Sequence, residues 1–454
     1  MCSPTTTCSS FSSAATSRPA SESLGDGGRM TGMPRVVFLA IGSRGDVLPM
    51  VALARELAER GTETLVLAHP EYVGIPRTQG IPCVSLGAGL VEHAQDQRRA
   101  QGLIGNPVLA AVGLQGWQWR IAGTLAPVLF THIRSDDVVV TGVVGVAAAL
   151  ALAEDRGCHV VHVTFSATLP SSGPMAMMSP LTKRPNRLVG LWTRHGVWTG
   201  SLALGHPLER VVRRALRLPW RSPWAVAGRA LAMPVLVAAS RELLPPQPDW
   251  PENTMVTGAW ELPGEPNPPD DELVEWLQRN PSPVYVGFGS MLSRDPAEDL
   301  RLIDAAAGAA GVVVIHRADD SAPHLDSTPH VHVVRTVDHR WLFPRCAAVI
   351  HHGGAGTTNA ALAAGVPSAI VAHGFDQPFH GRRLHELGVG PQPLRRATLT
   401  SRKLAALLAD LAHGPHREGY VRRAADVGGL VRIEHGAASA ADWLERTTLV
   451  PGRR

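Results

Sequence analysis

Several patterns that mark particular protein classes are scarce or missing in this chain of 454 residues. No apolar run reaches the roughly 18 residues of a membrane span. Tyrosine occurs only three times, and no Asp-x-Asp pair is present. No Cys-x-x-Cys pair is found, which argues against a disulfide framework or a zinc cluster and fits reduced thiols. The five scattered cysteines are Cys2, Cys8, Cys83, Cys158 and Cys346.

The first 33 residues lack the large apolar side chains that a core needs. Residues 1–33 are rich in Ser, Thr and Ala, and we expect a disordered N-terminal extension. They carry neither the basic start nor the continuous apolar stretch of a secretory signal. Together with the isolated cysteines, this predicts a cytoplasmic protein.

The chain as a whole lacks an excess of charge of one sign. Lys and Arg number 43 and Asp and Glu 39, which gives a net charge of +4, so we expect no nucleic-acid partner. The charge is unbalanced in residues 182–229, which contain ten basic residues and one acidic residue, Glu209. The basic residues are Lys183, Arg184, Arg187, Arg194, Arg210, Arg213, Arg214, Arg217, Arg221 and Arg229.

Four tryptophans, Trp192, Trp198, Trp220 and Trp224, are interleaved with these basic residues. Two interpretations stay open. One is a solvated helix face whose tryptophans turn inward. The other is a site for an anionic or lipid-like acceptor, or a peripheral contact of 182–229 with a membrane surface.

The first half of the chain alternates strand and helix patterns. Arg35–Ile41 is a continuous apolar strand, Gly42–Asp46 a turn, and Val47–Arg60 a helix with one apolar face that ends at Gly61. Thr64–Ala68 is the next strand, and the alternation continues. Strand–helix alternation predicts an α/β fold with a doubly wound parallel sheet.

The second half repeats this pattern after a proline-rich connector with one short strand near Thr254–Gly258. Asp271–Arg279 is predicted as a helix and Pro283–Gly287 as a strand. We therefore predict an N-terminal acceptor-binding domain (34–243), a linker (244–269), a C-terminal donor-binding domain (270–436) and a C-terminal helix and tail (437–454). Ligands bind beyond the carboxyl ends of parallel strands, so two such sheets that face each other would form a cleft.

The segment Ala347–Gly388 is the most informative part of the chain. It reads as strand, glycine-rich turn, helix, strand, polar turn and helix, with the first helix predicted over Thr357–Ala364. Glycines between a strand and a helix let the backbone approach an anion, and the helix amino end offers free N–H groups. A short glycine pattern also occurs in ordinary tight turns. The whole segment favours a diphosphate site.

Polar side chains surround this turn. His352 and Thr357 can donate hydrogen bonds to phosphate oxygens, as can Ser290 in a GFGS turn. The strand after the helix ends in Asp376-Gln377, whose carboxylate and amide can bind sugar hydroxyls. A diphosphate site next to a hydroxyl site indicates a nucleotide-sugar.

The order His-His-Gly-Gly-Ala-Gly-Thr, Gly-Val-Pro, Asp-Gln resembles the donor signature of nucleotide-sugar glycosyltransferases with the GT-B fold. It is most similar to the bacterial antibiotic and sterol glucosyltransferase branch of the UDP-glycosyltransferase family. The resemblance runs from about Arg35 to Leu444 and is weak in the middle. It implies two Rossmann-like domains facing a cleft, a last helix that crosses back onto the first domain, and inversion at the anomeric carbon.

The resemblance also implies that the base of the nucleotide lies near Val337. The nucleotide-sugar is then a co-substrate, and neither a cofactor nor a metal ion is needed if His352 and the helix amino end carry the charge. The predicted donor-binding residues are Ser290, Val337, His352, Gly354, Ala355, Gly356, Thr357, Asp376 and Gln377.

Transfer also requires a group that takes the proton of the acceptor hydroxyl. Only Arg44 and Asp46 are ionisable in the first glycine turn, and Asp46 is the candidate catalytic base. Relatives in the antibiotic and sterol branch carry a very similar GSRGD with the Asp in that role. The alternative is that Asp46 is an N-cap of the following helix. A helix amino end lowers the basicity of a carboxylate, and an apolar cleft could offset this.

Other residues of the turns are weaker candidates for the cleft: Gly42, Ser43, Arg44, His69 and His373. The acceptor is expected to contact Leu90–Leu125 and Ser166–Trp224, which are rich in Trp, Leu, Met and Pro. This suits a hydrophobic small molecule such as a polyketide, macrocycle, sterol or lipid. UDP and dTDP stay open as the nucleotide, and a glucose-like sugar is favoured.

Two rival functions are considered. A nucleotide-sugar epimerase or hydrolase on the same fold would need acids in the cleft and no large apolar acceptor pocket. A non-catalytic auxiliary protein would be expected to have a degraded donor segment, and here the segment is intact.

Overall fold

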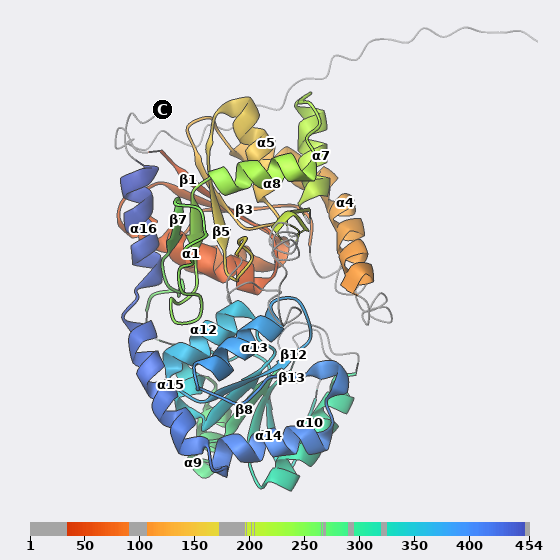
Figure 1. Cartoon of the computed structure of the whole chain (residues 1–454), viewed down its shortest axis with the longest axis vertical. Coiled ribbons are helices and arrows are strands. Elements are labelled where there is room, and N and C mark those ends of the chain that lie inside the picture. The colour runs from red at the N-terminus through yellow and green to blue at the C-terminus, as the bar shows by residue number, and fades with distance from the viewer. Residues whose placement is uncertain are drawn as a thin grey trace, which may run out of the picture.

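A computed structural model describes residues 34–89, 107–171, 196, 198–200, 202–203, 205–264, 266, 269–288, 295–318 and 325–449, and for 107–115 and 117 only the backbone. The described residues form two α/β domains stacked along the long axis of the molecule (Figure 1). The predicted extension 1–33 and the predicted donor residue Ser290 lie outside these ranges. So do 90–106 and 172–195, which make up much of the expected acceptor region.

The N-terminal domain is built on a sheet of seven described strands in the order β3-β2-β1-β4-β5-β6-β7, and every pairing is parallel. Its elements are β1 (Val36–Ala40), α1 (Arg44–Glu59), β2 (Thr64–Ala68), η1 (Pro70–Tyr72), α2 (Gly74–Thr78), β3 (Cys83–Ser85), α4 (Pro107–His132), β4 (Val138–Thr141), α5 (Val146–Arg156), β5 (His159–Thr164), α7 (His206–Ala215), α8 (Pro223–Ala232), β6 (Val235–Val237) and β7 (Thr254–Val256).

The C-terminal domain has a sheet of six described strands, also all parallel, in the order β10-β9-β8-β11-β12-β13. Its elements are α9 (Asp271–Arg279), β8 (Val284–Gly287), α10 (Pro296–Ala310), β9 (Val314–Arg317), β10 (Val331–Val334), α11 (His339–Leu342), η4 (Phe343–Arg345), β11 (Ala348–His351), α12 (Ala355–Ala364), β12 (Ser368–Ala372), α13 (Gln377–Glu386), β13 (Leu394–Arg395), η5 (Arg396–Thr398), α14 (Ser401–His413), α15 (Arg417–Arg432) and α16 (Gly436–Thr447).

The two parallel sheets confirm the predicted α/β class. The strands are buried along their length, as in β1 and β2, because helices cover both faces of each sheet. The segment 244–269, predicted as a linker, contains β7, which pairs with β6 at the edge of the N-terminal sheet. The proline-rich connector thus adds a strand to the N-terminal domain before the C-terminal domain begins.

Two helices begin earlier than their sequence patterns indicate. α1 starts at Arg44 and α12 at Ala355, so the ends of both glycine turns are helical. Gly365 ends α12 in the left-handed conformation, with φ +70°, as its sequence position predicts. In both cases the first helical turn carries the residues predicted for the site.

The last two helices form a strap along one side of the molecule (Figure 1). α15 lies on α12 of the C-terminal domain, and α16 packs against α1 of the N-terminal domain. Leu444 is fully buried in the core cluster that contains Leu53 and Leu57 of α1. Arg60, directly after α1, pairs with Glu445 at 3.2 Å and also contacts Asp442. α15 was not predicted from the sequence.

The domains are also joined at the end of β6. The backbone N–H of Ser240 donates to Asn359 Oδ1 of α12 at 2.9 Å, and its hydroxyl donates to Glu434 Oε1 at 3.0 Å. The Arg383 guanidinium of α13 donates to the carbonyl oxygens of Glu242 and Leu243. These bonds hold the donor-side helices against the first domain.

Candidate active site

The turn between β1 and α1 holds Asp46 in a fixed position. Asp46 Oδ2 accepts hydrogen bonds from the backbone N–H of Ser43 at 2.8 Å and from its hydroxyl at 3.0 Å. Both bonds fall on Oδ2, so Oδ1 is the oxygen left to take a proton. Gly42 has φ +145°, and a Cβ at this position would lie 2.3 Å from Asp46 Oδ2, so a side chain there would displace the carboxylate.

The alternative of Asp46 as an N-cap is corrected by this geometry. Ser43 is the N-cap of α1, and Asp46 is the third helical residue, which reaches back to the N-cap backbone as in a capping box. The carboxylate is therefore oriented by the helix start without being the cap. A structural and a catalytic role are compatible.

The surroundings of Asp46 favour a base. Burial raises the pKa of the half-buried Asp46 carboxyl, and the Asp376 carboxylate raises it further, while the hydrogen bonds from Ser43 act to lower it. The net direction is upward, so burial outweighs the local stabilisation of the charge. Because Asp376 is close enough to raise the pKa of Asp46, the turns of the two domains lie near each other.

The second turn links β11 to α12 and places His352 over the helix start. His352 is half-buried, and burial lowers its pKa to about 4, so the ring is neutral at pH 7. A Cβ on Gly354 would lie 2.5 Å from His352 Nε2, so only glycine lets the ring sit there. The neutral ring can present an N–H to an anion at this helix end.

The first turn of α12 contains the other predicted phosphate-binding groups. Gly354 is the N-cap, and Ala355, Gly356 and Thr357 form the first helical turn, where backbone N–H groups have no partner within the helix. Gly356 is exposed and Thr357 half-buried. With His352 beside them, these groups make an anion site of the kind found at helix amino ends.

Asp376 and Gln377 begin α13 but have different surroundings. Asp376 is half-buried and close enough to raise the pKa of both Asp46 and His352. Gln377 is only 4% exposed, and its Oε1 accepts from the backbone N–H of His373 at 2.7 Å and of Gly374 at 3.2 Å. That amide oxygen holds the turn, which leaves Asp376 as the better-placed group for a sugar hydroxyl.

The remaining predicted residues are dispersed. His373 lies near His352, and burial lowers its pKa to about 4. His69 is fully buried and its Nδ1 is 2.7 Å from the Ala88 carbonyl oxygen, so it supports the loop after β3. Val337 is half-buried before α11, and Arg44 is exposed at the start of α1.

The segment after β10 contributes a histidine that sequence reasoning missed. His339 stacks on Phe343 with ring centroids 4.3 Å apart, and its Nε2 lies 3.3 Å from the Tyr285 hydroxyl. Burial lowers its pKa to about 4, and the nearby cations Arg44 and Arg317 act in the same direction. The only signal was its place two residues after Val337. Trp341 of the same segment has Arg345 over its ring at 4.0 Å, so that face is occupied.

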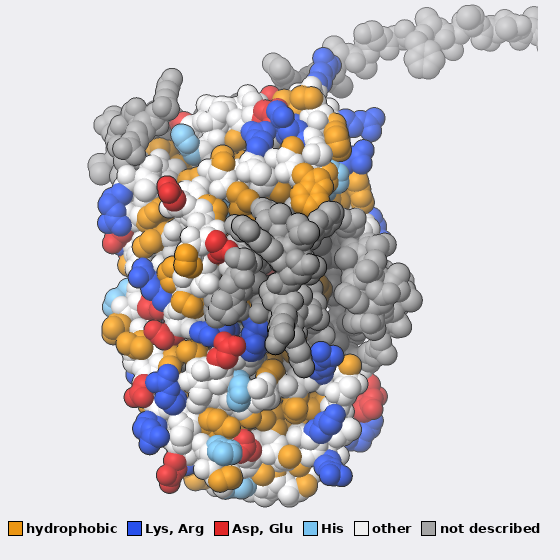
Figure 2. All heavy atoms as spheres, in the orientation of Figure 1, with side chains coloured by type: hydrophobic (Ala, Val, Ile, Leu, Met, Phe, Trp, Pro, Cys, Tyr) orange, Lys and Arg blue, Asp and Glu red, His pale blue; other side chains and the backbone are white. Residues whose placement is uncertain are grey.

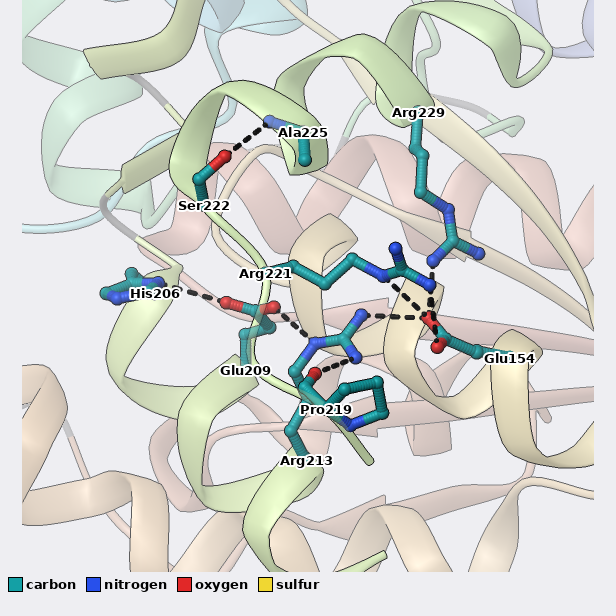
Figure 3. A network of polar contacts seen from close by, with 9 residues as sticks. All are labelled: Glu154, His206, Glu209, Arg213, Pro219, Arg221, Ser222, Ala225 and Arg229. Carbon is teal, nitrogen blue, oxygen red and sulfur yellow. Dashed lines mark hydrogen bonds and ion pairs between the residues drawn. The ribbon is translucent and has the colours of Figure 1, made fainter. Parts of the chain in front are cut away.

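Three arginines of the basic segment meet one carboxylate within the N-terminal domain (Figure 3). Glu154 of α5 receives Arg213 at 2.9 Å and Arg221 at 3.0 Å, and it also contacts Arg229. Trp198 is buried, whereas Trp220 and Trp224 are 66% and 56% exposed. Trp198 thus turns inward as the first interpretation predicts, Trp220 and Trp224 do not, and the acceptor or membrane contact stays a prediction; Trp192 lies outside the described residues.

Within the described ranges, no group of three or more His, Cys, Asp or Glu side chains is arranged to hold a metal ion. Nor does any described helix have both the length and the apolar character needed to cross a membrane.

Two parallel-sheet domains, one with an oriented carboxylate and the other with a glycine turn that suits an anion, define the GT-B class of glycosyltransferases. The sequence matches the N-terminal domain of glycosyltransferase family 28 over residues 36–162. It matches the C-terminal domain of the erythromycin biosynthesis protein CIII-like family over residues 300–429. The chain belongs to this glycosyltransferase family, in the branch that includes antibiotic and sterol glycosyltransferases.

Individual relatives agree with this assignment. Glycosyltransferase GtfE of Amycolatopsis orientalis is 32% identical over 90% of this chain and 97% of its own length. The uncharacterized glycosyltransferase ML2348 of Mycobacterium leprae is 32% identical, over 90% and 96% respectively. Sterol 3-beta-glucosyltransferase UGT80B1 of Arabidopsis thaliana is 28% identical over 91% of this chain and 68% of its own length. The chain is thus a glycosyltransferase.

Solved structures support the fold. The crystal structure of Os79 from O. sativa, in complex with U2F and trichothecene, has a TM-score of 0.66 at 17% identity and covers 91% of this chain and 99% of that one. The glycotransferase of kitacinnamycin has a TM-score of 0.62 at 18% identity, with the same coverage of both chains. At these identities the likeness concerns the fold alone.

Proposed function

We propose that this enzyme transfers a glucose-like sugar from a UDP- or dTDP-linked donor to a hydroxyl of a hydrophobic small molecule, with inversion of the anomeric carbon. The observation that carries the proposal is that Asp376 of the second domain lies close enough to Asp46 of the first to raise the pKa of its carboxyl. It brings a candidate base next to the predicted sugar and diphosphate groups.

The chemistry follows from these positions. Asp46 Oδ1 takes the proton of the acceptor hydroxyl, and the acceptor oxygen attacks the anomeric carbon as the bond to the diphosphate breaks. The first-turn N–H groups of α12 and His352 stabilise the negative charge on the leaving diphosphate, so no metal ion or cofactor is required. Attack opposite the leaving group converts an α-linked donor into a β-linked product.

The acceptor is proposed to be a natural product, sterol or lipid. The support is the apolar composition of the first half and the similarity to proteins named as a sterol 3-beta-glucosyltransferase and as glycosyltransferase GtfE. An epimerase or hydrolase would release its product without an acceptor. A non-catalytic protein would bind the donor without turnover.

We also propose a cytoplasmic enzyme that contacts a lipid surface through exposed Trp220 and Trp224, with no nucleic-acid partner. The described cysteines are free thiols, and charges of both signs are interspersed over the face shown in Figure 2.

Sedimentation with anionic vesicles tests the lipid contact. Loss of the protein from the pellet in the double variant Trp220→Ala/Trp224→Ala is expected, and a wild-type protein that never sediments contradicts it.

A thermal-shift titration tests the donor site directly. UDP, dTDP and their glucose conjugates are added with and without EDTA, and a ligand at one hundred times its dissociation constant stabilises folding by about 2.7 kcal/mol. A shift with one nucleotide that survives EDTA is expected. If no nucleotide shifts the melting temperature, the donor site is wrong. Product analysis with and without acceptors then separates transfer from hydrolysis.

A further inference from the structure

We propose that His351 and His380 are positioning residues, which bind the backbone N–H and the carbonyl of Gly353 and thereby fix the diphosphate-binding turn before the ligand binds. This role rests on the proposed donor site. Neither histidine is among the residues predicted to touch the donor, and both are fully buried.

One histidine accepts a hydrogen bond from Gly353 and the other donates one to it. The backbone N–H of Gly353 donates to His351 Nδ1 at 3.1 Å, and the Gly353 carbonyl accepts from His380 Nδ1 at 2.7 Å. The second ring nitrogen of each histidine is buried and has no hydrogen-bond partner among the described residues. Among the described residues, each ring therefore forms one hydrogen bond, and both bonds go to Gly353.

Packing leaves no room for a side chain at position 353. Its φ is +93°, and a Cβ would lie 2.9 Å from Ile370 Cγ2 and 3.0 Å from Gln377 Cβ. The peptide thus sits against β12 and the start of α13. The next residue, Gly354, is the N-cap of α12, so the orientation of the Gly353 peptide sets the direction of the N–H groups that follow.

The two rings come from elements that carry the rest of the site. His351 ends β11, directly before His352, and His380 lies in the first turns of α13, four residues after Asp376. The His380 bond therefore ties the helix that presents Asp376 to the turn that presents the anion-binding groups. We therefore expect the start of α13 and the turn before α12 to keep a fixed relative position.

The two bonds need opposite proton positions. His351 accepts through Nδ1, so the ring must be neutral, and burial together with neighbouring histidines holds its pKa well below the ordinary value. His380 donates through Nδ1. Without that donor the buried Gly353 carbonyl would lose the hydrogen bond that the described residues give it, and the turn would rearrange to find another. A preset turn spares the ligand this reorganisation cost.

Calorimetric titration of the full chain with UDP and dTDP tests the role through a pair of amide variants. The side-chain amide of Asn can take the place of the ring Nδ1, whereas that of Gln reaches only the place of Nε2. His380→Asn should bind within about threefold of wild type. His380→Gln should bind roughly tenfold more weakly, the loss of about one hydrogen bond to a buried group.

His162→Leu is the matched control. His162 is fully buried in the N-terminal domain, with no hydrogen-bond partner for either ring nitrogen among the described residues. The His162→Leu variant should have an altered melting temperature and an unchanged affinity for the nucleotide. Circular dichroism and melting curves for every variant separate weak binding from poor folding.

The outcomes are distinct. If wild type binds a nucleotide and the Asn and Gln variants at position 380 bind it equally, the positioning role is wrong and the proposed function stands. If affinity in both variants merely follows the loss of melting temperature, the role is again wrong, because a purely structural histidine would behave so. If wild type binds neither nucleotide, the proposed function falls and the positioning role with it.

Discussion

At the scale of the residue, Gly42 and Asp46 form one unit. A methyl group on Gly42 would lie 2.3 Å from Asp46 Oδ2, so Gly42→Ala should push the base out of place. Since general-base catalysis contributes about 10²–10⁴-fold, we expect kcat to fall by at least about 10²-fold, nearly as far as in Asp46→Asn. Steady-state kinetics with a turned-over acceptor would measure this.

Gly45→Ala is the control for that substitution. A Cβ on Gly45 would meet only the Ser43 hydroxyl at 3.5 Å, an ordinary contact. This variant should keep kcat within a few-fold of wild type. A Gly42→Ala enzyme that is as active as Gly45→Ala would contradict the role of Asp46.

The charge of Asp376 should appear in the pH dependence. Its negative charge raises the pKa of Asp46, so Asp376→Asn lowers that pKa. Asp46 must be ionised to accept a proton, and the acidic limb of the kcat/KM profile should therefore move to lower pH. The position of the limb is the measurement, because the rate also changes if a sugar contact is lost. Asp376→Glu keeps the charge and should leave the limb in place; a shift to higher pH in the Asn variant would refute the coupling.

At the scale of the element, the Glu154 network ties α5 to α7 and α8 (Figure 3). Hydrogen bonds from its arginines lower the pKa of Glu154 to about 2. A depressed carboxyl pKa contributes stability that is present above its unfolded value and is lost as pH falls toward 2. The side chain is 18% exposed and two of its partners are 39% and 34% exposed, so part of the gain is screened by solvent.

Glu154→Gln should therefore lower the free energy of unfolding by about 2 kcal/mol at pH 7. The difference in free energy of unfolding between the variant and wild type should shrink as pH falls from 4 toward 2, because wild type then also loses the negative charge of Glu154. Denaturant titrations at several pH values measure it. Asp155→Asn, in a more exposed pair with Arg156 at 3.6 Å, should cost under about 0.5 kcal/mol. Equal losses in the two variants would show that the network does not stabilise the domain.

At the scale of the whole molecule, α16 makes the end of the described chain part of the first domain. Leu444 is fully buried with α1 in one core cluster. Truncation of a buried leucine costs about 2–5 kcal/mol, so Leu444→Ala should destabilise the N-terminal domain although it follows the C-terminal one. Denaturation followed by tryptophan fluorescence can report this, because Trp260 lies in the same cluster.

Ile433 provides the comparison for Leu444. It lies in the short connection between α15 and α16 and is 69% exposed, so Ile433→Ala should change stability little. If Leu444→Ala left the transition of the N-terminal domain unchanged, the strap would not contribute to its core.

Much of this protein follows from local patterns. Strand–helix alternation predicted both sheets, and the glycine turns located Asp46 and His352 before any coordinates. The boundaries of α1 and α12 were misjudged, because glycines that look like turn residues form the first helical turn in each case. Gln377 was predicted to contact sugar hydroxyls; its buried Oε1 holds a turn, and the sugar contact stays a prediction.

The sequence by itself determined the fold class and the chemical groups available for catalysis, because hydrophobic periodicity and short motifs depend only on near neighbours in the chain. Tertiary structure alone decided that Asp376 lies close enough to Asp46 to raise its pKa, that His380 binds the Gly353 carbonyl, and that Glu154 pairs with Arg213, Arg221 and Arg229. These are contacts between residues far apart in the sequence. Their energies depend on burial and on which charges meet, and both arise only once the chain has folded.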